Sequence, residues 1–124
     1  MKQLIAIAAG GALGAVMRYA MSNAVYSLLG RGFPYGTLAV NVVGSLLMGF
    51  LFVWLVERSA LDAIWRAALL VGGLGAFTTF STFSMETLNL LEEGALLPAL
   101  LNVLLSVVLC IAAAWGGVLV ARQL

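Results

Sequence analysis

One stretch decides how this chain folds: residues 72–84, which read GGLGAFTTFSTFS. The stretch lies in a run from Ala67 to Met85 that carries no charged residue and is long enough to cross a bilayer. Three glycines within four residues weaken a helix, because glycine adds backbone freedom and no side-chain packing. In lipid, broken backbone is tolerated only where protein buries it or where it lines a cavity. The stretch therefore predicts a membrane helix broken at Gly72–Thr78, beside an ion or solute site.

The composition predicts a protein that lies in the membrane. Hydrophobic residues make up 64% of the chain and charged residues 9%, whereas soluble domains are about a quarter charged. The apolar composition predicts membrane lipid as a partner, whereas a net charge of +1 without a basic cluster predicts no nucleic-acid partner. The chain has no histidine and a single cysteine, Cys110, so neither a Cys/His metal site nor a disulfide framework is expected. It also lacks paired carboxylates within the spans, and we expect no enzymatic activity.

Hydrophobic segments predict a single all-α membrane domain over residues 1–124. Each segment exceeds the roughly 20 residues that cross the hydrocarbon core of a bilayer. The predicted spans are 4–29, 32–56, 67–91 and 94–121. Four spans place both termini on one side of the membrane. Basic residues are slightly more frequent on that side, and this mild bias does not decide the orientation.

Small residues spaced four apart predict close contacts between helices. Gly10 and Gly14 form one such pair, and Ser45 and Gly49 form another. Four helices have little interior in which to enclose a polar path. We therefore expect an oligomer, most simply a dimer.

Polar side chains form one seam on each of three spans. The seams comprise Thr37, Asn41, Ser45 and Met48; Thr79, Phe80, Phe83 and Glu86; and Asn102, Ser106 and Cys110. A single serine or threonine in a membrane helix usually forms an interhelical hydrogen bond. Three seams beside a broken helix instead favour a hydrated pathway. Phenylalanine rings most often face lipid or the core, although their positive edges can also lie against an anion.

Arg18 is the one cation inside a predicted span. Such a residue costs at least about 2.5 kcal/mol at mid-membrane unless it is solvated or paired. Two interpretations are open: Arg18 concentrates anions in a vestibule, or it pairs or extends toward the interface for structural reasons. Glu86 lies near the end of its span, where an aqueous mouth would solvate it.

The motif Gly-x-x-Gly-x-x-Thr-Thr-Phe-Ser-Thr-Phe-Ser at residues 72–84 resembles the signature of the bacterial fluoride channels, the Fluc or CrcB-type family. Other features fit in order and spacing along essentially the whole chain. Gly10 and Gly14 lead to Arg18 in the first span, and Asn41 follows the start of the second. A motif of this length within a four-span chain is a specific signal.

The resemblance implies an antiparallel, dual-topology homodimer in the bacterial cytoplasmic (inner) membrane. Such a dimer has two pores through which fluoride leaves the cytoplasm by passive electrodiffusion. The fluoride pathway expected from the resemblance and the seams comprises Asn41, Phe80, Phe83, Thr79, Ser106, Cys110, Arg18 and Glu86. The resemblance also implies a structural sodium ion (Na+) held by the backbone carbonyls of Gly75 and Thr78. We expect Gly75 to adopt a backbone conformation that a Cβ would oppose.

Several positions depart from the family pattern: Leu74, Ala76, Phe77 and Cys110. They leave the motif phenylalanines, the asparagine and the two carbonyl positions in place. The alternative is a small multidrug-resistance transporter, a proton-coupled exporter of cationic drugs that is also a four-span dimer. Such a transporter needs a glutamate in its first span, and here that span carries Arg18 and no carboxylate.

Overall fold

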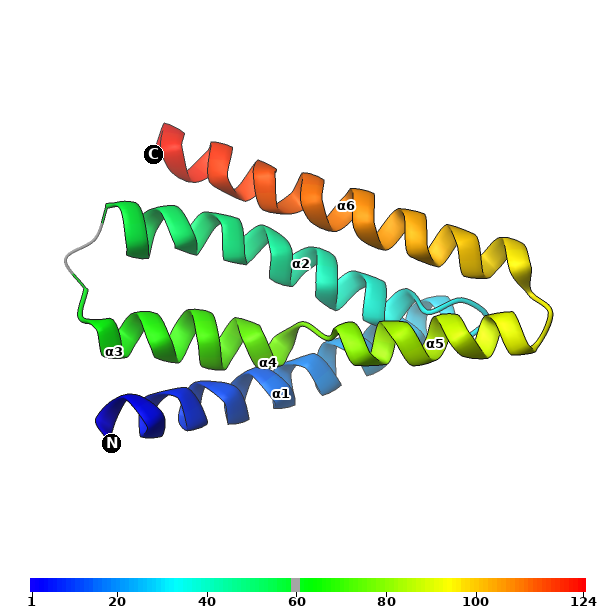
Figure 1. The fold of residues 1–124 in the computed structure, drawn as a ribbon, viewed down its shortest axis with the longest axis horizontal. Coiled ribbons are helices and arrows are strands. Elements are labelled where there is room, and N and C mark those ends of the chain that lie inside the picture. The colour runs from blue at the N-terminus through cyan, green and yellow to red at the C-terminus, as the bar shows by residue number, and fades with distance from the viewer. Residues whose placement is uncertain (59–60) are drawn as a thin grey trace.

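The computed structural model describes residues 1–58 and 61–124 and consists of long helices that lie side by side (Figure 1). Four helical segments in the described part of the chain are long and apolar enough to cross a membrane, as predicted, and their ends lie within a few residues of the predicted spans. The helices are α1 (Lys2–Leu29), α2 (Tyr35–Phe52), η1 (Val53–Glu57), α3 (Ala63–Arg66), η2 (Ala67–Leu74), α4 (Gly75–Phe77), α5 (Phe80–Glu92) and α6 (Leu96–Gln123). The second span is α2 with η1, and the third span is the row from α3 to α5.

Two glycines form the tight connections at one end of the bundle. Gly30 follows α1 with a φ of 80°, and Gly94 precedes α6 with a φ of 77°. Both angles lie in the left-handed region that glycine adopts without strain. The connection expected at Glu57–Arg66 includes residues 59–60, which lie outside the described residues. Both chain termini lie at the opposite end of the bundle from these glycines (Figure 1).

Glycines allow two pairs of helices to approach closely. A Cβ built on Gly14 of α1 would lie 2.1 Å from the carbonyl oxygen of Gly73, in η2. A Cβ on Gly49 of α2 would lie 2.0 Å from the carbonyl oxygen of Ala114, in α6. Neither position has room for a methyl group without separation of the helices. The predicted small-residue contacts are therefore confirmed at both glycines.

The break in the third span lies at Thr78, the last residue of the predicted range, and at Thr79, one residue beyond it. Thr78 (φ −81°, ψ 156°) and Thr79 (φ −149°, ψ 115°) are extended. Gly72 remains in the wide helical turns of η2, where a Cβ would lie 2.4 Å from the carbonyl oxygen of Ile7. Gly72 thus serves close packing against α1 rather than unwinding.

Gly75 corrects a second expectation. Its backbone is helical (φ −61°, ψ −37°), and the nearest atom to a built Cβ is the carbonyl oxygen of Leu70, at 3.7 Å. This is ordinary van der Waals contact in a conformation that any residue adopts. The expectation that a Cβ would oppose the backbone conformation of Gly75 is therefore wrong.

Candidate functional site

The break diverts two backbone amides from their usual helical acceptors. In a continuous helix the amide of Thr79 would donate to the carbonyl of Gly75, and that of Thr82 to Thr78. Here the Thr79 amide donates to Asn41 Oδ1 at 2.7 Å, and the Thr82 amide donates to Thr79 Oγ1 at 3.2 Å. The Thr79 side chain therefore caps the start of α5. The carbonyls of Gly75 and Thr78 lose the donors that a helix would give them.

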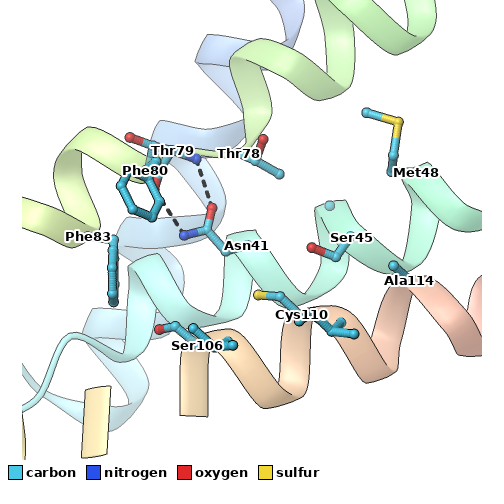
Figure 2. A pocket seen from close by; sticks show the side chains of 13 residues that line it. Asn41, Ser45, Met48, Thr78, Thr79, Phe80, Phe83, Ser106, Cys110 and Ala114 are labelled. Carbon is cyan, nitrogen blue, oxygen red and sulfur yellow. Dashed lines mark hydrogen bonds between the residues drawn. The ribbon is translucent and has the colours of Figure 1, made fainter. Parts of the chain in front are cut away.

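Asn41 joins α2 to the break through both ends of its amide. Asn41 Nδ2 donates to the carbonyl oxygen of Thr79 at 3.0 Å, opposite the bond that Oδ1 accepts (Figure 2). This side chain offers extended backbone the same donor and acceptor pair that another peptide group would offer. An asparagine amide has two N–H donors, so one of them is left for a ligand. The role of Asn41 as a donor to fluoride stays a prediction.

Arg18 contacts the break from the α1 side. Its Nε donates to the carbonyl oxygen of Ala76 at 3.1 Å. A backbone carbonyl at the end of a helix is a suitable partner for an intramembrane cation. Arg18 also lines a small cavity of about 90 Å³, which it shares with Thr79 and Thr82. This geometry agrees with the pairing interpretation of Arg18.

A pocket of about 440 Å³ lies beside the break (Figure 2). Its walls come from α2, the break, α5 and α6. It brings together most of the predicted pathway residues: Asn41, Thr79, Phe80, Phe83, Ser106 and Cys110. Every side chain that lines it is uncharged. Two of the predicted residues, Arg18 and Glu86, line other cavities.

Phe80 and Phe83 stand on successive turns of α5 at the edge of the pocket (Figure 2). Their ring centroids are 5.3 Å apart and the rings are tilted by 45°. Phe80 is 78% exposed within the subunit. The Phe80 ring therefore belongs to the surface of the subunit rather than to its core.

The polar residues on α6 have two different surroundings. Asn102 is buried, and its Nδ2 donates to Thr87 Oγ1 of α5 at 2.9 Å, so it serves as an interhelical contact. One turn later, Ser106 is 8% exposed and lines the pocket. Within residues 1–58 and 61–124, the hydroxyl of Ser106 has no hydrogen-bond partner. A buried hydroxyl without a partner costs free energy unless a ligand or water satisfies it.

Glu86 lies in a separate cavity of about 540 Å³. Its carboxylate accepts hydrogen bonds from Thr37 Oγ1 and, at 3.1 Å, from the hydroxyl of Tyr26. The guanidinium of Arg31 lies 4.5 Å from the centre of the Tyr26 ring. Sequence reasoning missed Tyr26, because tyrosines are common near the ends of membrane helices whatever their role.

Four helices of membrane-spanning length define a small multi-pass membrane protein, with an uncharged pocket beside its broken helix. Comparison with known proteins gives the family. The sequence model of a protein family, described as CrcB-like protein, Camphor Resistance (CrcB), matches residues 5–118. The chain therefore belongs to the CrcB-like family.

Several relatives carry the name fluoride-specific ion channel FluC, among them the following three. The protein from Methylococcus capsulatus is 64% identical over 121 residues, which cover 98% of this chain and 53% of the relative. This chain therefore spans about half the length of that relative. The Magnetococcus marinus protein is 56% identical over 97% of this chain and 98% of its own length. The Citrifermentans bemidjiense protein is 52% identical over 100% of both chains. Ion channels are not enzymes, so the expectation of no enzymatic activity is confirmed for this family.

Proposed function

We propose that this chain forms a fluoride-selective channel in the bacterial cytoplasmic membrane, through which fluoride leaves the cell by passive electrodiffusion. The names of its relatives support fluoride as the ion. The pocket beside the break supports the location of the path, because it gathers Asn41, Phe80, Phe83 and Ser106 at one site.

The observation that carries the proposal is the Ser106 hydroxyl, which is buried in this pocket without a partner. Fluoride is small and strongly hydrated, so a protein must replace its water with hydrogen-bond donors. The hydroxyl of Ser106 and the second N–H of Asn41 are such donors. The uncharged lining also matters, because a fixed positive charge would hold the anion and slow its exit.

The phenyl rings add a second, weaker attraction for an anion. The edge of an aromatic ring is positive and its face is negative. Phe80 and Phe83 can therefore present ring edges to an anion in the pocket while their bulk keeps the path narrow. Narrowness and donor placement together would give selectivity for fluoride over chloride.

A second copy of the chain would complete the site. Gly75 and Phe80 are exposed on the third span of the isolated subunit, next to carbonyls that have lost their helical donors. Lipid cannot satisfy such groups, so protein must cover them. We propose an antiparallel homodimer inserted in both orientations, with one path for each subunit.

The carbonyl oxygens of Gly75 and Thr78 suit a structural sodium ion at the centre of this dimer. The amides that would bond them in a helix donate instead to Asn41 and to the Thr79 hydroxyl, so another partner could bind both oxygens. Carbonyl oxygens are hard ligands, as sodium requires. The bound ion would supply positive charge where carbonyls from two subunits meet.

Fluoride efflux from liposomes that contain only this protein tests the proposal. We expect fluoride to leave down its gradient without a coupled proton, while chloride is retained. A cationic drug serves as a second control, because the multidrug alternative predicts proton-coupled drug transport. Retention of fluoride by liposomes with correctly folded protein would contradict the proposal.

A further inference from the structure

Cys110 is a thiol inside the pocket, and nothing in the fluoride pathway requires sulfur there. It is the only cysteine of the chain and is half-buried. Figure 2 shows it one turn after Ser106 on α6, and both residues line the pocket. Met48 adds a thioether to the same lining from α2.

A second observation indicates that a hydrogen-bond partner is missing from this part of the pocket. Ser106, four residues before Cys110, is 8% exposed, and its hydroxyl has no partner within the described chain. Water or an ion in the pocket would satisfy that hydroxyl. The thiolate is the form of cysteine that binds metals.

We propose that Cys110 is a binding site for soft monovalent metal cations, and that a cation bound there arrests fluoride passage. This inference rests on the fluoride pathway proposed above. Thiolate and thioether sulfur select soft metals, and the faces of Phe80 and Phe83 also attract cations. The lining carries no fixed positive charge that would repel a cation.

The binding step involves no oxidation or reduction. The S–H bond of Cys110 breaks, its proton passes to water or buffer, and the sulfur electron pair forms a bond to the metal ion. The metal then occupies the pocket beside Ser106 and attracts fluoride instead of letting it pass. A chelating dithiol removes the metal and restores the free thiol.

Silver ion, Ag⁺, is the probe. It is small enough to enter a narrow path, and silver fluoride is soluble, so the experiment is done in fluoride and gluconate without chloride. Fluoride efflux from liposomes is measured before silver, after silver and after dithiol treatment. Each protein is compared with its own untreated flux. Free thiol is then counted by mass after maleimide labelling of the denatured protein.

We expect the native protein to lose most of its flux with silver and to regain it with dithiol. Cys110→Ser should keep most of its own flux. A matched control moves the thiol along the same helix: Val108→Cys in the Cys110→Ser background. Val108 is 60% exposed and does not line the pocket, so silver should leave this variant conducting.

The two readouts separate failure of this inference from failure of the proposed function. A thiol that stays free, or equal silver block of Cys110→Ser, overturns the metal site. If silver occupies the Cys110 thiol but fluoride efflux is unchanged, the proposal that the bound metal blocks fluoride is wrong, and the ion path lies elsewhere. If the untreated protein passes no fluoride, the channel proposal fails, while the thiol count still decides whether Cys110 binds silver.

Discussion

Single side chains determine how the broken helix is stabilised. Asn41 supplies both a donor and an acceptor to Thr79, and Arg18 donates to the carbonyl of Ala76. Hydrogen bonds of this kind contribute about 0.5–1.5 kcal/mol each, and leaving a buried backbone group unpaired costs more. The same residues therefore fix the backbone from which Phe80 and Phe83 reach the pocket.

Replacing Phe80 or Phe83 by isoleucine separates a pore role from a packing role. Isoleucine keeps much of the apolar bulk but has no ring edge. We expect each variant to remain folded and oligomeric by size-exclusion chromatography while fluoride efflux falls strongly. Because Phe80 is 78% exposed, Phe80→Ile should cost little subunit stability. Normal flux through well-folded variants would refute the pore role.

Asn41→Asp changes the donor end of the amide with little change in shape. The variant would place a carboxylate oxygen against the Thr79 carbonyl and a negative charge beside the path. We expect Asn41→Asp to abolish fluoride efflux, whereas Asn41→Ser keeps part of it. Both variants lose at least one of the two hydrogen bonds between residue 41 and Thr79. Thermal unfolding in detergent therefore measures how much stability each variant loses. Equal flux in the two variants would assign Asn41 a purely structural role.

At the scale of helices, close approach between backbones positions the third span. Gly14 lies against η2 and Gly49 lies against α6, so each pair of helices is held at a distance that excludes a methyl group. The first half of the third span thus packs on α1, while Asn102 and Thr87 join its second half to α6. The break lies between these two attachments.

Gly14→Ala tests this packing, with Gly11→Ala as its control. A Cβ at Gly14 would lie 2.1 Å from the carbonyl oxygen of Gly73, whereas a Cβ at Gly11 would lie 3.8 Å from that of Gly72. Overpacking typically costs about 1–3 kcal/mol. We expect Gly14→Ala to lower the midpoint of thermal unfolding in detergent and Gly11→Ala to leave it nearly unchanged. Equal effects would show that helix separation at Gly14 is inexpensive.

Hydrophobic length predicted four helices able to cross a membrane, and the described part of the chain contains four such helices. The sequence predicted the break less well, because a run of glycines indicates close packing and unwinding equally, and only the neighbouring Ile7 and Gly14 distinguish the two. Periodicity brought Ser106 and Cys110 together on α6. It could not reveal the bridge from Asn41 to Thr79, because the partner is backbone from a distant segment.

At the scale of the whole molecule, the subunit leaves its site on an outer surface. The exposed residues Gly75 and Phe80 lie on the third span, next to the pocket. Lipid cannot satisfy the backbone carbonyls next to this surface, and for that reason we propose that another protein surface covers it. The proposed dimer and its sodium ion therefore concern the same region as the fluoride path.

Sodium replacement tests this region as a unit. We expect exchange of sodium for N-methylglucamine to weaken the dimer and lower fluoride flux, because carbonyls of Gly75 and Thr78 would lose their cation. Gly75→Ala is the matched variant: the subunit has room for its Cβ, so any loss of dimer must arise from the partner surface. Dimerisation and flux that are indifferent to sodium would leave the ion without support.

Both chain ends emerge at the same end of the bundle. A tag on either end therefore reports the direction in which a molecule is inserted in the membrane. In any one molecule, an impermeant label added outside a vesicle reaches tags at both ends or at neither. A population inserted in two directions would therefore be labelled partially, and to the same extent at either end. A population inserted in one direction would be labelled fully or not at all. One epitope at the C-terminus is thus enough to count the two orientations in living cells.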